Sequence, residues 1–139
     1  MANTPIFNNK QTVQQQRAAF ALNEISKIAE KNKGKISAEL ASFIVGMPTT
    51  ILANGIGQTF AFLLSKGKEK QQTTFDIMKK WIIQKKPDIF SQELDNMQFL
   101  QTFNSISQHQ YLEIQHEELR LLEWLKRYAR AFEDKTSDK

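Results

Sequence analysis

The chain has 139 residues, of which 24% are charged and 40% hydrophobic, with no cysteine, five glycines and three prolines. This length fits one domain with a core, and the lack of cysteine excludes a disulfide framework, a thiolate metal site and a cysteine nucleophile. The net charge of +4 is unevenly distributed: residues 66–86 hold seven lysines against two acids, whereas residues 87–123 hold seven acids against one arginine. Because glycine and proline are scarce, we expect long helices with short connections.

Residues 1–9 are expected to form a flexible arm, and they lack the basic-then-apolar layout of a secretion signal. From about Gln11 to Lys31, apolar side chains repeat every three or four residues, which predicts an amphipathic helix. A Lys-Gly-Lys sequence at residues 33–35 ends this helix. A short, capped second helix is expected to follow and to end near Gly46.

The stretch from Pro48 to Gly67 predicts a central helix, at about residues 48–66, because proline favours a helix start and glycine a helix end. This helix is apolar around most of its circumference, so other helices should enclose it. Gly55 and Gly57 each weaken a helix interior by about 1 kcal/mol, which predicts the close approach of another helix at that point. The uncharged stretch from Leu40 to Ser65 also has the length of a membrane span, but Pro48, which interrupts it, and several polar residues argue against that interpretation.

Three further helices are expected in the second half of the chain. Pro87 ends the first, Ser91 caps the second, and the third covers about residues 108–133. Their apolar stripes are the expected core: Phe75, Met78, Trp81 and Ile82, then Met97, Phe99, Leu100, Phe103 and Ile106, then Leu112, Leu119, Leu122, Leu125, Ala129 and Phe132. We therefore predict an all-α single domain over residues 1–139. It is a compact bundle of five or six helices, with a flexible tail at residues 134–139.

Four residues of metal-ligating type share one face of the last predicted helix: His109, Glu113, His116 and Glu117. Glu113 and His116 match the Glu-x-x-His motif of bundle di-iron proteins, but such sites need a second motif and two more carboxylates. A solvated polar face is the preferred interpretation, as it is for the other acids of the last two helices. A small metal-dependent enzyme built on His109, Glu113 and His116 stays open as an alternative. Without a nucleophile motif or a phosphate-binding glycine loop, we expect no catalysis, metal or cofactor.

The basic residues are the strongest functional signal. Lysine and arginine side chains neutralise phosphates without reading base sequence, although a solvated basic face is the competing interpretation. Trp81 and Trp124 fall on apolar stripes, so we expect them in the core rather than stacked on nucleic-acid bases.

Two segments resemble one known family. MPTTILANGIGQTFAFLLSKG (47–67) is similar to the signature of the small helical subunit of type III-B CRISPR effector complexes, the Cmr complexes. YLEIQHEELRLLEWLKRYARA (111–131) is similar to the C-terminal helix of that family, and residues 15–19 fit its opening segment. Residues 32–46 and 68–106 match only in length and helical character.

The resemblance implies a non-catalytic, cytoplasmic subunit of an antiviral RNA-guided ribonucleoprotein. Copies of such a subunit stack into a minor filament, beside a backbone subunit that holds the guide RNA and cleaves target RNA. The implied partners are other Cmr subunits, especially the backbone subunit, copies of itself, and the backbones of guide and target RNA, with no membrane. Combining charge with the matching segments, we expect nucleic-acid contact at Arg17, Lys66, Lys68, Lys126, Arg127 and Arg130. For Lys68 this rests on charge alone.

The charge distribution adds a hypothesis for stacking. The acidic region 87–123 of one copy would meet the basic region 66–86 or 124–130 of the next copy, in a head-to-tail contact that does not close into a ring. The alternative function is a helical adaptor that binds only proteins and whose lysines serve solubility.

Overall fold

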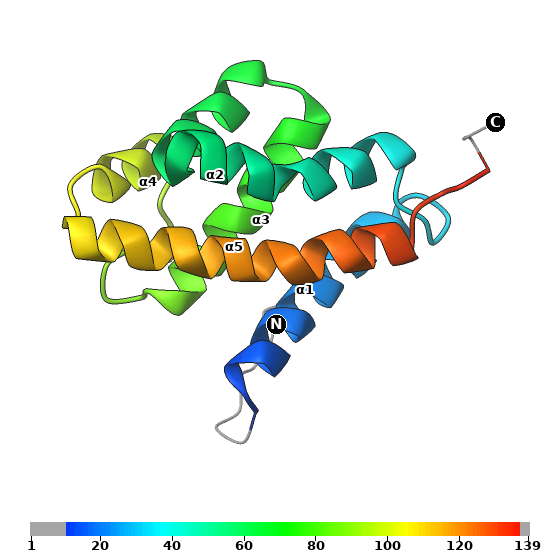
Figure 1. Ribbon diagram of the computed structural model, residues 1–139, viewed down its shortest axis with the longest axis horizontal. Coiled ribbons are helices and arrows are strands. Elements are labelled where there is room, and N and C mark those ends of the chain that lie inside the picture. The colour runs from blue at the N-terminus through cyan, green and yellow to red at the C-terminus, as the bar shows by residue number, and fades with distance from the viewer. Residues whose placement is uncertain (1–10, 137–139) are drawn as a thin grey trace. The chain divides into compact units, whose positions relative to one another are not determined.

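The computed structural model describes residues 11–136, of which 76% are helical, and in that range it contains five helices and no strand (Figure 1). In chain order these are α1 (Val13–Glu30), α2 (Ala38–Lys66), α3 (Glu69–Lys85), α4 (Asn96–Phe103) and α5 (Gln108–Ala131). The all-α prediction is therefore confirmed. The expected arm, residues 1–9, and the last part of the expected tail, residues 137–139, lie outside the described residues.

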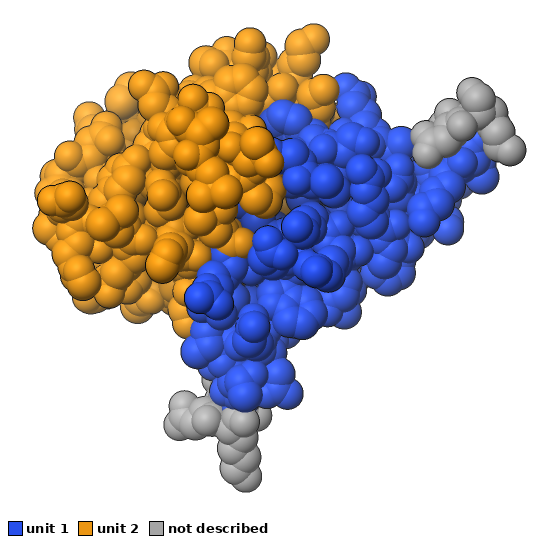
Figure 2. Space-filling model, in the orientation of Figure 1, with its two compact units in different colours: residues 1–46, 120–139 blue, residues 47–119 orange. Residues whose placement is uncertain are grey.

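The chain divides into two compact units, which Figure 2 shows in different colours. Unit 1 comprises residues 1–46 and 120–139, and unit 2 comprises residues 47–119. The boundaries fall within α2 and α5, so each unit contains one part of each of these two helices. The organisation as a single domain over residues 1–139 stays a prediction.

In unit 1, α1 begins with a capping box. The backbone N–H of Gln15 donates to Thr12 Oγ1 at 3.0 Å, and the N–H of Thr12 donates to Gln15 Oε1 at 2.8 Å. The expected break at residues 33–35 is confirmed, because α1 ends at Glu30 and Gly34 has a φ of 81° that reverses the chain. The buried apolar residues of this unit come from all its helical segments and from the connection between α1 and α2: Phe20, Ala21, Ile25, Ala29, Ile36, Leu40, Ala41, Ile44, Leu121, Leu122, Leu125 and Ala129.

Backbone hydrogen bonds in unit 1 hold the segment that follows α5. The N–H of Ile36 donates to the Phe132 carbonyl, and the N–H of Asp134 donates to the Ile36 carbonyl, each at 2.7 Å. Ile36 and Glu133 also form an isolated parallel β-bridge, and the Ile36 side chain is fully buried. The first residue of the expected tail is thus bonded to unit 1, whereas flexibility beyond residue 136 stays a prediction.

Helix α2 runs continuously past Pro48, so the predicted boundary between a short helix ending near Gly46 and a second helix beginning at Pro48 is wrong. Helical geometry is lost instead at Gly55, where φ is 83° and ψ is 158°. Proline removes one N–H donor but keeps φ near the helical value, whereas Gly55 reverses the sign of φ. The glycine, and not the proline, therefore sets the break.

Side chains of α5 replace the helical hydrogen bonds that are lost at Gly55. The N–H of Ile56 donates to Gln115 Oε1 at 2.9 Å, and the N–H of Gly57 donates to the Tyr111 hydroxyl at 3.0 Å. A Cβ atom built at Gly55 would lie 3.0 Å from the Tyr111 hydroxyl, and one built at Gly57 would lie 3.3 Å from it. The expectation that these glycines mark the close approach of another helix is confirmed.

Phe60 of α2 is the centre of an aromatic cluster in unit 2. Its ring makes edge-to-face contacts with Phe75 of α3 at 5.6 Å and with Phe99 and Phe103 of α4 at 5.4 and 5.2 Å between centroids. Phe90, from the connection before α4, stacks on Phe99 at 5.0 Å. Each such pair contributes about 0.5–1.5 kcal/mol beyond its buried area. This part of α2 is thus the central helix of its unit, as its apolar sequence predicted.

One face of α2 is not enclosed, contrary to the prediction. Leu52 is 71% exposed and Phe62 is 37% exposed, because the buried contacts of this helix are made by the opposite side chains, such as Phe60. By length and composition α2 would suit a membrane span, and a third of its most apolar stretch is buried. Its helical path, however, is interrupted at Gly55. The expectation that the chain does not contact a membrane stays a prediction.

The start of α4 also differs from the prediction. Asp95, and not Ser91, caps this helix: the N–H of Gln98 donates to Asp95 Oδ1 at 2.8 Å, and the N–H of Asp95 donates to Gln98 Oε1 at 3.0 Å. Asp95 caps the helix because a glutamine three residues later completes its capping box, whereas Leu94 occupies that position after Ser91.

Three residues that we expected in the core are exposed because they lie at the edges of the buried stripes. They are Met97 on α4, Leu112 on α5 and Phe132 just after α5.

Candidate nucleic-acid interface

Three of the predicted contact residues lie on the last turns of α5, in unit 1: Lys126, Arg127 and Arg130. Arg120 precedes Arg127 by seven residues, which is about two helical turns, so both guanidinium groups lie along one side of the helix. The Arg127 side chain is 67% exposed. Within residues 11–136, no carboxylate pairs with Arg120. This stretch of α5 therefore carries a group of basic side chains at the surface.

Two carboxylates of unit 1 hold these basic side chains in place. Glu123 accepts from Arg127 Nη1 at 3.1 Å and pairs with Lys126 Nζ at 3.4 Å. The hydrogen bond from Arg127 is the main reason that the pKa of the Glu123 carboxyl lies below its ordinary value. Arg130 Nη1 lies 2.8 Å from Oε1 of Glu133, which is only 6% exposed. The pair between Arg127 and Glu123 is exposed, and exposed ion pairs are worth at most about 1 kcal/mol. A phosphate can therefore displace the carboxylate from Arg127.

A hollow of about 280 Å³ lies beside these residues and is lined by Gln14, Arg120, Glu123, Trp124 and Arg127. The indole N–H of Trp124 donates to Gln14 Oε1 at 3.0 Å, and its ring stacks on Tyr128 at 6.0 Å between centroids. Trp124 was expected in the core, but it is only partly buried and its side chain lines this hollow. The sequence signal was present: Trp124 lies one turn from both Arg120 and Arg127, on a charged edge of the apolar stripe.

The other predicted contact residues lie elsewhere. Lys66 and Lys68 belong to unit 2, where Lys66 Nζ lies 5.5 Å from the centroid of the Phe62 ring and Lys68 is exposed at the start of α3. Arg17 is partly buried on α1, one turn after Gln14, and does not line the hollow. The structure therefore brings Lys126, Arg127 and Arg130 together on one helix, and contact of all six residues with nucleic acid stays a prediction.

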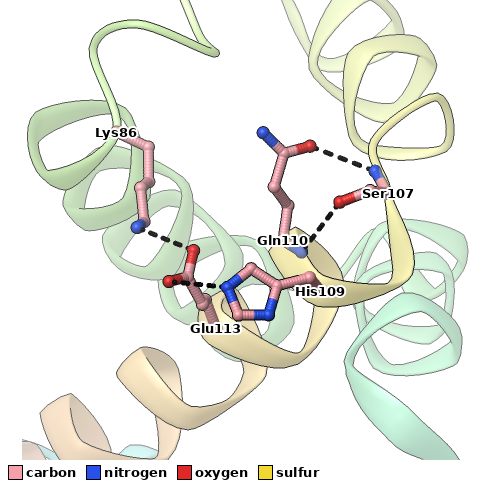
Figure 3. Close-up of polar contacts among 5 residues, drawn as sticks. All are labelled: Lys86, Ser107, His109, Gln110 and Glu113. Atoms are coloured by element: carbon pink, nitrogen blue, oxygen red, sulfur yellow. Dashed lines mark hydrogen bonds and ion pairs between the residues drawn. The ribbon is translucent and has the colours of Figure 1, made fainter.

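Glu113, the carboxylate of the alternative metal site, is paired with a lysine from outside that site. Figure 3 shows Glu113 between two nitrogen-bearing side chains, with Oε1 at 3.2 Å from Lys86 Nζ and Oε2 at 3.4 Å from His109 Nε2. In the same view Ser107 and Gln110 form the capping box that begins α5. His116 is exposed, and residues 11–136 contain no group of three side chains placed to hold a metal ion. The geometry of Glu113 is that of an ion-paired surface carboxylate.

We expected from the sequence that all the acids of α5 would be solvated, but one of them is not. Glu118 is fully buried, and neither of its carboxylate oxygens has a hydrogen-bond partner among residues 11–136. Burial, and then the neighbouring charge of Glu117, raises the pKa of the Glu118 carboxyl well above its ordinary value. Glu117 accepts a hydrogen bond from the indole N–H of Trp81 at 2.9 Å, and Trp81 is fully buried as predicted. The helical period places Glu118 in line with Ile114 and Leu122, so its burial could have been read from the sequence.

The family model described as CRISPR-associated protein (Cas_Cmr5) matches residues 13–132, from the first residue of α1 to one residue past α5. The chain belongs to the Cmr5 family. The resemblance seen in residues 47–67 and 111–131 is thereby confirmed and extended over all five helices. Cmr5 proteins are small, non-catalytic subunits of the type III-B Cmr complex, so this chain is a small subunit that associates with other Cmr subunits.

Proposed function

We propose that this Cmr5 protein is a non-catalytic, cytoplasmic subunit of an antiviral ribonucleoprotein, that its copies form the minor filament, and that it contacts the backbones of guide and target RNA. The observation that carries the RNA contact is the concentration of Arg120, Lys126, Arg127 and Arg130 on a short stretch of α5. Within the complex, base pairing between guide and target supplies sequence specificity. The basic side chains need only neutralise phosphates.

The acidic region that was expected to contact the next copy is largely engaged within the chain. Five of its seven acids have a structural role: Asp95, Glu113, Glu117, Glu118 and Glu123. Asp88 and Glu93 are exposed, and neither has a partner within residues 11–136. Charge-driven stacking of copies, which we retain as part of the proposal, therefore depends mainly on these two carboxylates.

RNA binding across a salt series tests the phosphate contacts. We compare the wild type with the triple variant Arg120→Gln, Lys126→Gln, Arg127→Gln, measuring affinity for a fluorescent single-stranded RNA and for a guide–target duplex. The slope of log affinity against log salt should decrease in magnitude by about 0.7 for each phosphate of the single strand that the variant no longer neutralises. Arg130 is left unchanged because its removal would strand the buried carboxylate of Glu133.

A matched control removes three charges elsewhere in unit 1: Lys31→Gln, Lys33→Gln, Lys35→Gln. If α5 contacts phosphates, this control should keep most of the affinity and the salt slope. Equal reductions of affinity in both variants would show that only net charge matters and would contradict a defined interface. Absence of wild-type binding to either RNA at low salt would favour the adaptor that contacts only proteins.

A further inference from the structure

We propose that the hollow beside α5 binds one unpaired nucleotide, with its base on the Trp124 indole and its phosphate on Arg120. This inference rests on the proposed RNA contact, but it assigns to unit 1 a base-binding site in addition to the phosphate contacts. The hollow of about 280 Å³ is lined by the Trp124 side chain together with the guanidinium-bearing side chains of Arg120 and Arg127.

The indole of Trp124 is fixed before any ligand arrives. Its N–H is bonded to Gln14 Oε1 at 3.0 Å, and its ring is stacked on Tyr128. These two contacts restrict both χ angles of Trp124, so its side chain loses little further entropy when a base stacks on it. Stacking on such an aromatic platform contributes about 1–3 kcal/mol per base.

The charges of the hollow fit a nucleotide better than an acidic peptide. Arg120 has no ion-pair partner in the described part of the chain, so its guanidinium is available to a phosphate. Glu123 also lines the hollow and stays ionised, because its hydrogen bond from Arg127 lowers the pKa of its carboxyl. A carboxylate there repels an acidic side chain but can accept a hydrogen bond from the amino group of a cytosine base.

The test uses the wild-type chain and two strands of equal length and charge: a short oligocytidylate, and an abasic ribose-phosphate strand. Oligocytidylate should bind about tenfold more tightly than the abasic strand, which is the lower part of the range for one stacked base. Only oligocytidylate should quench the tryptophan fluorescence, and the signal reports on Trp124 because Trp81 is fully buried. This comparison needs no substitution, so it does not depend on the folding of a variant.

The Trp124→Leu variant should bind both strands equally, at the affinity of the abasic strand, and lose the fluorescence change. Equal, steeply salt-dependent binding of both strands by the wild type would overturn the base site and leave the phosphate contacts intact. Absence of binding to either strand at low salt would overturn both proposals. Tighter binding of an oligoglutamate peptide than of oligocytidylate would overturn the base site in favour of an acidic protein segment.

Discussion

The Tyr111 hydroxyl accepts a hydrogen bond from the backbone N–H of Gly57 at 3.0 Å, across 54 residues of sequence. An N–H group at this position of a regular helix would donate to a carbonyl four residues earlier. Here Gly55 has left the helical conformation, so a side chain of α5 caps the new helical segment in place of a local residue. The loss of helical geometry at Gly55 therefore depends on the hydrogen bonds that α5 supplies to the next residues.

Gly55→Ala should destabilise the protein by about 1–3 kcal/mol, because alanine is strained at a φ of 83° and its Cβ would lie 3.0 Å from the Tyr111 hydroxyl. Chemical denaturation measures the free energy of unfolding. Gly46→Ala is the matched control, since Gly46 lies within α2 and a Cβ there meets nothing within 4 Å. The control should be neutral or stabilised by up to about 1 kcal/mol. Equal effects at the two positions would contradict the special role of Gly55.

Tyr111→Phe removes the acceptor of the Gly57 N–H while keeping the ring that packs against Phe103. A partly buried donor left without a partner costs about 1–3 kcal/mol, and we expect a loss of stability in that range. Tyr128→Phe serves as the control, because its ring stacks on Trp124 and no hydrogen bond of its hydroxyl is found within residues 11–136. A thermal melt that is unchanged in Tyr111→Phe would show that water replaces the hydroxyl.

Glu118→Gln should change how stability depends on pH. Burial raises the pKa of the Glu118 carboxyl, so above the ordinary glutamate pKa of 4.5 the folded chain keeps a proton that the unfolded chain releases. The free energy of unfolding of the wild type therefore decreases as pH rises from that value toward the pKa of the folded state. Glutamine cannot ionise, so the variant should gain stability relative to the wild type as pH rises above 4.5.

Glu123→Gln should change stability in the opposite direction to Glu118→Gln. The pKa of the Glu123 carboxyl is lowered, mainly by the hydrogen bond from Arg127, so ionised Glu123 stabilises the folded chain above its ordinary pKa and loses this effect as pH falls. The variant should be less stable than the wild type at pH 8, by less than about 1 kcal/mol because the pair is exposed.

The Glu118 prediction has a contradicting outcome of its own. If Glu118→Gln loses stability at pH 8, the carboxylate of Glu118 is ionised and paired in the folded chain.

The Asp88→Lys, Glu93→Lys variant tests the stacking of copies. If these two carboxylates meet a basic region of the next copy, the wild type should form oligomers that dissociate as salt rises, and the variant should stay monomeric at low salt. Analytical ultracentrifugation at several salt concentrations measures both. Glu30→Lys, at the end of α1 and outside the acidic region, is the control and should associate as the wild type does. Salt-insensitive oligomers in all three proteins would point to an apolar contact, for which exposed Leu52 is a candidate.

Helical periodicity predicted the fold well where one face of a helix is buried. It placed Phe75, Met78 and Trp81 together in the core, and it set the ends of α3 and α5 within two residues. It did not predict the loss of helical geometry at Gly55, because the dihedral angles there are supported by a residue 60 positions later, and the glycine by itself indicated only the close approach of another helix. It also failed at Glu118, where the chemical type of the residue outweighed the helical position in our interpretation, and burial followed the position.

The candidate site was only partly predictable. Sequence identified Lys126, Arg127 and Arg130 by charge, and the resemblance identified the family. The hollow was missed because its walls come from the start of α1 and the end of α5, and Gln14 and Trp124 are 110 residues apart. Neither residue is distinctive alone, and only the fold of unit 1 places them in contact.

The bond from Ile56 to Gln115 spans 59 residues, and this has a consequence for synthesis on the ribosome. The segment that follows Gly55 lacks its cap until α5 has been made. A growing chain that ends before residue 111 therefore has only water to bond the N–H groups at this helix start, beside the apolar side chains of Phe60 and Leu63. Such a chain gains its long-range contacts late, which slows folding and leaves that apolar surface open to chaperones until synthesis is nearly complete.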